Sequence, residues 1–278
     1  MSMVQIVIMV VAVIGMIVGL SKQKAGAEWG KPLAVVCIIV ALAAALWSSV
    51  RTLGGKDNSG VVDREITFQK TGGKKLGLYL AEKHAGAKVL ILTEPKLGSQ
   101  PAKENPLVTG LKEGLEGKLT VAAETSPEVP ADKAKAFAAE MPMEGAPGGA
   151  GGPGEMMPPL EYWYTAKIFD ALLEKYSGQF DLLVTTIGLP QDARASKVLS
   201  GKTRPKIAVL NGSIYDLKGA FKPDMIVAAI TYNPKAVYDD KPVPKNIDEA
   251  FSKRFLLVTP ETLQQVVSQS PDIFRAGN

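Results

Sequence analysis

Small polar side chains follow four apolar segments of the sequence, at the points where strands of a sheet would end. The segments are residues 88–93, 181–187, 206–210 and 225–231, each rich in aliphatic residues. In open α/β sheets, ligands bind beyond the carboxyl ends of the strands. We therefore predict a polar ligand-binding cleft formed by Glu94, Gly188, Gln191, Asp192, Asn211, Ser213 and Asn233. The alternative is a set of ordinary turns, because Gly, Asn, Asp and Ser are also common turn residues.

The other reactive side chains argue against catalysis. No GxSxG or HExxH pattern occurs, and no acid/base pair stands out. The one histidine, His84, lies near the end of a predicted helix, where we expect a surface position. We therefore predict no catalytic residue and a protein that is not an enzyme. The rival prediction is a hydrolase or transferase that uses the strand-end carboxylates Glu94 and Asp192.

The sequence gives little support to a redox function, to nucleic-acid binding or to a phosphate-binding loop. The single cysteine, Cys37, excludes an intramolecular disulfide and a cysteine-based metal cluster. Aromatic residues make up only 6% of the chain and no run of five or six like charges appears, so no nucleic acid partner is expected. The segment KTGGKK at residues 70–75 fails the phosphate-loop pattern, because Lys75 replaces the required Ser or Thr. It predicts a plain turn and a helix start, and we predict no cofactor.

A segment rich in glycine, proline and methionine interrupts the chain at about residues 126–159. Its last part, residues 141–159, contains six glycines and five prolines. Such a composition cannot offset the entropy of ordering by burying a core, so we predict a flexible insert, preceded by a surface helix at residues 130–140. Its methionines could bind Cu(I), but adhesive packing on a neighbouring surface is favoured, and we predict no metal site. These are Met141, Met143, Met156 and Met157.

Two long apolar runs open the chain. Residues 3–20 and 33–50 contain no charged side chain, and eighteen helical residues extend about 27 Å, close to the hydrocarbon thickness of a bilayer. Trp29 and Trp47 lie about where an aromatic belt would place them around the second run. We predict that residues 1–51 form a transmembrane helical hairpin. The alternative, a pair of buried core helices, is disfavoured because such helices usually keep a polar face.

The charges beside these runs indicate an orientation. The short loop between them carries Lys22, Lys24 and Lys31 against Glu28. Positive charge favours the cytoplasmic side, so we expect both chain ends outside and the following domain on the extracytoplasmic side of the inner membrane. Arg51 and Lys56 oppose this orientation. Residues 52–60, which are polar and glycine-rich, predict a tether.

Residues 61–278 alternate between strand-like and helix-like segments. The predicted strands are residues 61–68, 88–93, 118–123, 181–187, 206–210, 225–231 and 255–259. The predicted helices are residues 74–85, 107–115, 161–176, 192–199, 247–253 and 260–268. Strands joined by helical crossovers build a layered α/β sandwich. The expected fold class is therefore α/β, with the hairpin followed by a Rossmann-like layered domain that has a mainly parallel sheet.

The two halves of this domain look related. Residues 80–86 (LAEKHAG) and 172–178 (LLEKYSG) each close a predicted helix just before a buried strand. Gly86 and Gly178 are expected in the left-handed conformation that ends helices. With its repeated α-β-α-β order, the domain resembles the type 1 periplasmic binding proteins, the substrate-binding family of ABC transporters, whose lobes are built from such units. The resemblance implies a role linked to transport.

The expected function is that of a non-enzymatic, membrane-anchored α/β domain of solute-binding type. It would sense or deliver a ligand, or act as a subunit of a membrane transport complex. Its expected partners are the lipid bilayer, other subunits of such a complex and a small-molecule ligand. The rival is an interaction scaffold with a degenerate cleft, which displays the insert to protein partners. In that case alanine at Asp192, Asn211 and Asn233 leaves function intact, while deletion of residues 141–159 destroys it.

Overall fold

The computed structural model describes four isolated residues near the N-terminus and three longer segments. These are Ile17, Val18, Ser21, Val36 and residues 59–95, 104–140 and 158–274. The chain divides into two compact units, Met1–Asp63 and Arg64–Asn278.

In the first unit, the four isolated residues are helical, and Ile17 and Val36 are 59% and 56% exposed. No helix within the described segments has both the length and the apolar character needed to cross a membrane. The predicted spans at residues 3–20 and 33–50 lie almost wholly outside those segments.

Six strands form one sheet in the order β2-β1-β3-β4-β5-β6. The strands from β1 to β5 pair in parallel, whereas β6 runs antiparallel to β5, with Tyr232 opposite Phe255. The predicted mainly parallel sheet is therefore confirmed, with one antiparallel strand at its edge. The strands are β1 (Lys88–Leu92), β2 (Thr120–Thr125), β3 (Leu182–Thr185), β4 (Lys206–Val209), β5 (Ile226–Tyr232) and β6 (Phe255–Val258).

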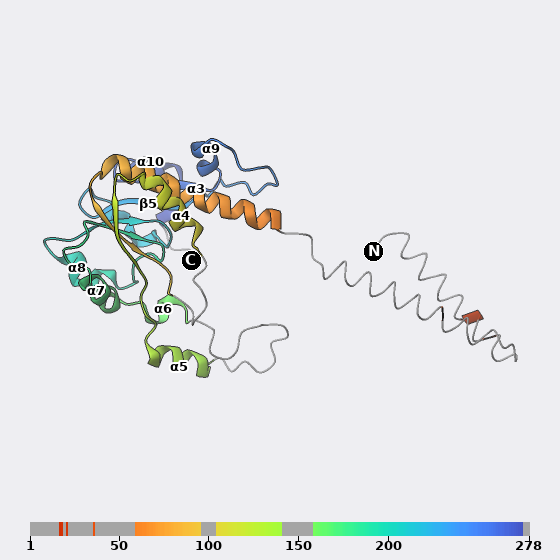
Figure 1. The fold of residues 1–278 in the computed structure, drawn as a ribbon, viewed down its shortest axis with the longest axis horizontal. Helices are drawn as coiled ribbons and strands as arrows, with labels where there is room; N and C mark the ends of the chain where they lie inside the picture. The colour runs from red at the N-terminus through yellow and green to blue at the C-terminus, as the bar shows by residue number, and fades with distance from the viewer. Residues whose placement is uncertain are drawn as a thin grey trace. The chain divides into compact units, whose positions relative to one another are not determined.

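Helices cover both faces of this sheet (Figure 1). The α-helices are α3 (Ser59–Lys83), α4 (Pro106–Leu115), α5 (Ala131–Glu140), α6 (Leu160–Trp163), α7 (Ala166–Glu174), α8 (Lys197–Ser200), α9 (Ile247–Ser252) and α10 (Leu263–Gln269). Three short 3-10 helices complete the set: η1 (Ala193–Ala195), η2 (Tyr215–Ala220) and η3 (Pro271–Phe274).

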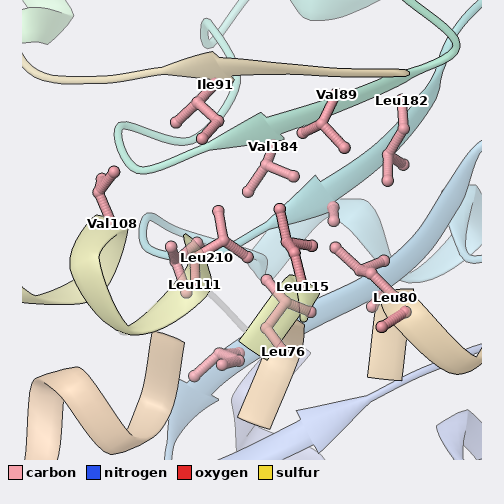
Figure 2. Packing of buried hydrophobic residues seen from close by; sticks show 14 of the residues in the cluster. Leu76, Leu80, Val89, Ile91, Val108, Leu111, Leu115, Leu182, Val184 and Leu210 are labelled. Atoms are coloured by element: carbon pink, nitrogen blue, oxygen red, sulfur yellow. The ribbon is translucent and has the colours of Figure 1, made fainter. Parts of the chain in front are cut away.

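Alternate residues of each buried strand enter two separate cores, as period-two side-chain geometry requires. On one face, leucines of α3 and α4 pack against β1 and β3, and Figure 2 shows Leu76, Leu80 and Leu111 directed at Val89 and Val184. On the other face, α7, α8 and α10 pack against the intervening strand residues. That second core includes Leu90, Leu92, Phe169, Leu173, Leu183, Leu199 and Val266. The result is a three-layer α/β/α sandwich.

Helix α3 corrects two predictions. Residues 61–68 are helical and not a strand, and the glycines at 72 and 73 lie inside the helix and not in a turn. Phe68, Leu76 and Leu80 recur at multiples of four, which places them on one face of the helix against the sheet core. The strand-like composition of residues 61–68 was misleading, because most of this stretch is exposed and its only buried residue is Phe68.

Two glycines of α3, Gly73 and Gly77, face α4. A Cβ atom built on Gly73 would lie 2.0 Å from the carbonyl oxygen of Leu107, and one built on Gly110 would lie 1.9 Å from the carbonyl oxygen of Lys70. Real side chains cannot approach backbone so closely, so only glycine allows the two helices to pack at this distance. Residues 70–75, which do not match the phosphate-loop pattern, therefore belong to the part of α3 that packs against α4.

The two halves of the domain join into a single sheet. The units α3-β1-α4-β2 and α7-β3-α8-β4 meet where β1 pairs with β3, and their helices lie on opposite faces. This is the arrangement that a twofold axis parallel to the strands would produce. Gly86 and Gly178 have φ values of 83° and 73°, which confirms the predicted left-handed helix ends.

Other boundaries differ in smaller ways. The predicted helix at 161–176 is broken at Tyr164 and Thr165 into α6 and α7, because an extended backbone there starts a new, separately capped helix. Helix α10 begins three residues after Pro260. The predicted surface helix before the insert is confirmed as α5. Ser59 and Gly60 of the predicted tether belong to α3, while residues 52–58 and 141–157, with the four methionines of the insert, lie outside the described residues.

Candidate functional site

The carboxyl ends of the parallel strands meet at one edge of the sheet. Because β6 is antiparallel, its first residue, Phe255, lies at the same edge beside Tyr232 at the end of β5. The two rings lie 5.6 Å apart between centroids. Helices α3 and α4 cover this edge from one face, so residues of five elements converge here.

A small pocket of about 90 Å³ opens between the ends of β4 and β5. Its walls come from α3, α4 and the two strands, and its apolar part includes Leu107, Ile230 and Phe255. Its polar part is made by Gln69, Asn211, Thr231 and Tyr232. None of the residues that line it carries a charge.

The polar side chains of the pocket are available to a ligand. The side chains of Gln69, Asn211 and Thr231 form no hydrogen bond with any residue in the described segments. Gln69 is half-buried, so its amide has lost part of its access to water. An amide offers both donors and an acceptor, and a hydroxyl can act as either. The pocket can therefore bind a neutral polar group in more than one orientation.

Two glycines set the backbone beside Asn211. Gly188 follows β3 with φ 74°, and Gly212 follows β4 with φ 122°, which are conformations that other residues rarely adopt. A Cβ atom on Gly212 would lie 2.6 Å from the Cα atom of Gly188. The hydroxyl of Thr185 donates to the carbonyl oxygen of Gly188 at 2.9 Å and fixes this turn. The strand-end glycines thus place Asn211 at the pocket mouth.

Two predicted carboxylates have structural partners. Glu94 accepts a hydrogen bond from the Asn105 amide at 2.9 Å, and Asn105 in turn caps α4 by accepting from the Leu107 N–H at 2.9 Å. Asp192 accepts from the Ala166 N–H at 2.7 Å. It therefore caps the first turn of α7, whose own N-cap residue makes no side-chain bond.

The remaining predicted residues are turn residues. Ser213 accepts from the Tyr215 N–H at 3.4 Å. Asn233 donates to the Ser252 carbonyl at 2.7 Å and accepts from the Lys235 N–H at 2.9 Å. Gln191 is exposed. The structure thus brings Asn211 to the pocket with Gly188 beside it, and distributes the other five elsewhere along the edge; a ligand role for any of the seven stays a prediction.

Sequence reasoning missed the pocket residues that come from α3 and β6. Gln69 lay in a segment predicted to join a strand to a turn, and Phe255 began a predicted strand for which no direction was predicted. A helical reading of α3 would have placed Gln69 next to Phe68, whose burial is visible from its spacing to Leu76 and Leu80. No comparable signal marks Phe255, because strand direction is not encoded in its apolar run.

A second, larger pocket of about 360 Å³ lies at the opposite, amino edge of the sheet. Lys83, His84, Asp181 and Lys206 line it. Asp181 already accepts a hydrogen bond from the Lys88 N–H at 3.0 Å. The pKa of His84 is lowered, first by burial and then by the positive charge of Lys206. Since ligands of parallel α/β sheets bind at the carboxyl edge, we favour the smaller pocket as the functional site.

The described segments contain no set of side chains that could bind a metal ion. Within the described segments, no group of three or more His, Cys, Asp or Glu side chains comes close enough to coordinate an ion. Neither pocket brings an acidic group and a basic group together around a nucleophile in the way that general acid/base chemistry needs.

No protein-family model matches this chain, and no curated protein matches its sequence. Among solved structures, the chain is similar to one in the XylFII-LytSN complex, with 14% sequence identity and a TM-score of 0.37. The similarity covers 70% of this chain and 60% of that chain, so it spans less than two thirds of the other chain's length. A likeness this distant says nothing about what the chain binds.

Proposed function

We propose that this protein is a non-enzymatic, membrane-anchored α/β domain that binds a small neutral polar group at the carboxyl edge of its sheet. The observation that carries the proposal is the uncharged pocket, in which the side chains of Gln69, Asn211 and Thr231 form no hydrogen bond with any described residue. The binding group would belong to a solute that the domain senses or delivers, or to another subunit of a membrane transport complex.

The size and lining of the pocket define the ligand class. A volume of about 90 Å³ corresponds to about three water molecules, at roughly 30 Å³ each. Whole drug-sized ligands need roughly 300–1,000 Å³. The pocket therefore suits a hydroxyl- or amide-bearing fragment, or the tip of a longer molecule. An ionised group would gain no opposite charge from the lining and would lose part of its hydration.

The anchor is the second part of the proposal. The uncharged runs at residues 3–20 and 33–50 support a transmembrane hairpin. The exposure of the helical residues Ile17 and Val36 also favours lipid contact over burial in a protein core. We propose that the hairpin lies in the inner membrane with the α/β domain on the extracytoplasmic side.

Thermal unfolding of the full-length chain in detergent tests the pocket. We expect neutral compounds such as acetamide, glycerol or monosaccharides to raise the melting temperature, because a ligand that binds only the folded state stabilises it. Acetate and phosphate, which are charged, should leave the melting temperature unchanged. Asn211→Ala and Gln69→Ala should each abolish the shift, while Gln191→Ala, which removes an exposed amide outside the pocket, should preserve it. A shift that survives both pocket substitutions would reject the site.

Cysteine labelling tests the anchor and its orientation. Cys37 is the only native cysteine, so Cys37→Ser gives a background in which Ser59→Cys is the single thiol. We expect an impermeant maleimide to label that thiol on cells with a permeable outer envelope and an intact inner membrane. Labelling only after lysis would reverse the orientation, and recovery of the chain without membranes would reject the anchor.

One observation favours the alternative function, that of an interaction scaffold. A pocket too small for a whole metabolite is large enough for one side chain of a partner protein. In that case no free compound shifts the melting temperature, and deletion of residues 141–159 abolishes capture of the partner. Asn211→Ala would then weaken capture only if the partner inserts a side chain into this pocket.

A further inference from the structure

The loop between β5 and α9, residues 233–246, presents an apolar and basic surface. Val237 and Tyr238 are 66% and 67% exposed, and Tyr232, just before the loop, is 60% exposed. Large apolar side chains this exposed and this close in sequence are unusual on a solvated surface. Tyrosine is enriched where proteins meet the headgroup layer of a bilayer, because its ring is apolar and its hydroxyl is polar.

The charge of this loop is positive, because residues 233–246 contain three lysines and two aspartates. Asp240 pairs with Arg64 at 3.0 Å, and Asp239 lies 3.8 Å from the Lys241 ammonium group. Lys235 and Lys245 are exposed and form no ion pair with any residue of the described segments. Basic side chains are attracted to a membrane surface that carries anionic lipids. Lipid phosphates are thus the complementary partner.

The loop is fixed in place by Arg254. Its guanidinium group lies between two aromatic rings, 4.2 Å from the Phe68 centroid and 4.3 Å from the Tyr238 centroid. It donates to the Val237 carbonyl at 2.6 Å and to the Glu65 carboxylate at 3.0 Å. The side chain is only 2% exposed. Val237 and Tyr238 are therefore presented in a preset conformation, which lowers the entropy cost of docking.

The position of the loop in the chain agrees with a membrane contact. The loop contacts α3 through the ion pair between Asp240 and Arg64, and Figure 1 shows the segment that leads into α9 beside this helix. Arg254 contacts Glu65 and Phe68 of the same helix. Eight residues, 51–58, separate the end of the second apolar run from the start of α3. Even fully extended, a connection of this length spans at most about 32 Å.

We propose that the β5–α9 loop docks on the headgroup layer of an anionic bilayer, with Val237 and Tyr238 inserted among the lipids and Lys235 and Lys245 against phosphates. The inference rests on the proposed anchor, which brings the loop within reach of the membrane. Docking would fix the orientation of the domain and hence the direction in which its ligand pocket opens.

Fluorescence of the full-length chain in nanodiscs tests this docking. In the Cys37→Ser background, Val237→Cys carries an environment-sensitive fluorophore, and discs contain either zwitterionic lipid alone or added phosphatidylglycerol. A fraction of the lipid carries a nitroxide on its headgroup and quenches nearby fluorophores. The control label is Tyr215→Cys in η2, a second exposed aromatic position outside the loop.

We expect quenching at position 237 to be at least twofold stronger than at position 215 in anionic discs. Lys235→Gln with Lys245→Gln should remove this difference. Equal quenching at both positions in anionic discs would overturn the docking while leaving the anchor intact. If the fluorophore at position 237 is buried to the same extent in zwitterionic and in anionic discs, it contacts another copy of the chain. That result would also overturn the proposed docking. Failure of the chain to co-elute with discs would instead reject the anchor, and the docking with it.

Discussion

Gly77 of α3 and Gly114 of α4 face each other with no side chain between them. A Cβ atom on Gly77 would lie 2.8 Å from the Cα atom of Gly114 and 2.5 Å from the Leu111 carbonyl oxygen. One turn earlier, Gly73 lies against the Leu107 carbonyl oxygen and Gly110 lies against the Lys70 carbonyl oxygen. Two GxxxG spacings thus meet backbone to backbone. The close approach brings α4 near Gln69, so that Leu107 and Gln69 line the same pocket.

Gly110→Ala should destabilise the domain by about 2 kcal/mol, because its methyl group would overlap the Lys70 carbonyl and force the helices apart. This loss exceeds the roughly 1 kcal/mol that alanine gains over glycine in a helix. Chemical denaturation of the full-length chain measures the change. Gly219→Ala, where nothing lies within 4 Å of the added methyl group, should change stability by less than about 0.5 kcal/mol. Equal stability of Gly110→Ala and the parent chain would contradict the close packing.

The buried part of the sheet was predictable because its signal is local. Continuous apolar runs such as KVLIL at β1 and KIAV at β4 need no tertiary information, since both faces of each strand are covered. Helix ends at Gly86 and Gly178 were equally local, because a positive φ selects glycine. The direction of a strand was harder to predict, because β6 has the same apolar character as the other strands and yet runs antiparallel.

The errors have a common physical cause. Glycine has two uses, as a residue of turns and as the residue that lets two helices approach closely, and Gly73 serves the second. Which use applies depends on α4, more than thirty residues away. A pocket does lie at the carboxyl edge, and of the seven predicted residues Asn211 lines it. A ligand role for any of the seven stays a prediction. Asp192 was a reasonable ligand residue by type, but its carboxylate caps α7, a contact set by the folded chain.

Arg254→Ala should cost about 2–3 kcal/mol of stability, because it leaves the Val237 carbonyl and the Glu65 carboxylate without their donor. It should also loosen the β5–α9 loop. Hydrogen–deuterium exchange should therefore speed up at residues 236–240 more than elsewhere. Arg204→Ala, which breaks a more exposed ion pair with Asp224, should reduce stability far less, because exposed ion pairs are screened by solvent. Unchanged exchange in the loop would show that Arg254 does not fix it.

Tyr164→Phe should leave the domain as stable or raise its stability by about 1 kcal/mol. The Tyr164 hydroxyl is buried and has no hydrogen-bond partner within the described segments. The same burial raises the pKa of this phenol well above its usual value. Its ring packs edge-to-face on Trp163 and Phe169, and phenylalanine would keep both contacts. The melting temperature measures the effect, with Tyr215→Phe as an exposed control. A clear loss of stability would mean that the hydroxyl has a partner.

His84 should make stability depend on pH between about 7 and 5. Burial lowers its pKa first, Lys206 lowers it further, and Glu261 acts in the opposite direction. Because the folded pKa lies below the unfolded value of about 6.5, the unfolded chain takes up the proton first as pH falls. The contribution of neutral His84 is therefore present above pH 6.5 and is lost as pH falls through it. The drop in melting temperature from pH 7.5 to 5.5 should be smaller in His84→Gln than in the parent chain.

The same residue allows a direct measurement, because the chain contains one histidine and hence one imidazole resonance in NMR spectra. Its titration midpoint should lie below that of a free histidine. Lys206→Gln should raise the midpoint by removing the nearby positive charge, whereas Lys218→Gln, in η2, should leave it unchanged. A midpoint at or above 6.5 in the parent chain would mean that the carboxylate of Glu261 dominates over burial and Lys206. The pH dependence of stability would then have the opposite sign.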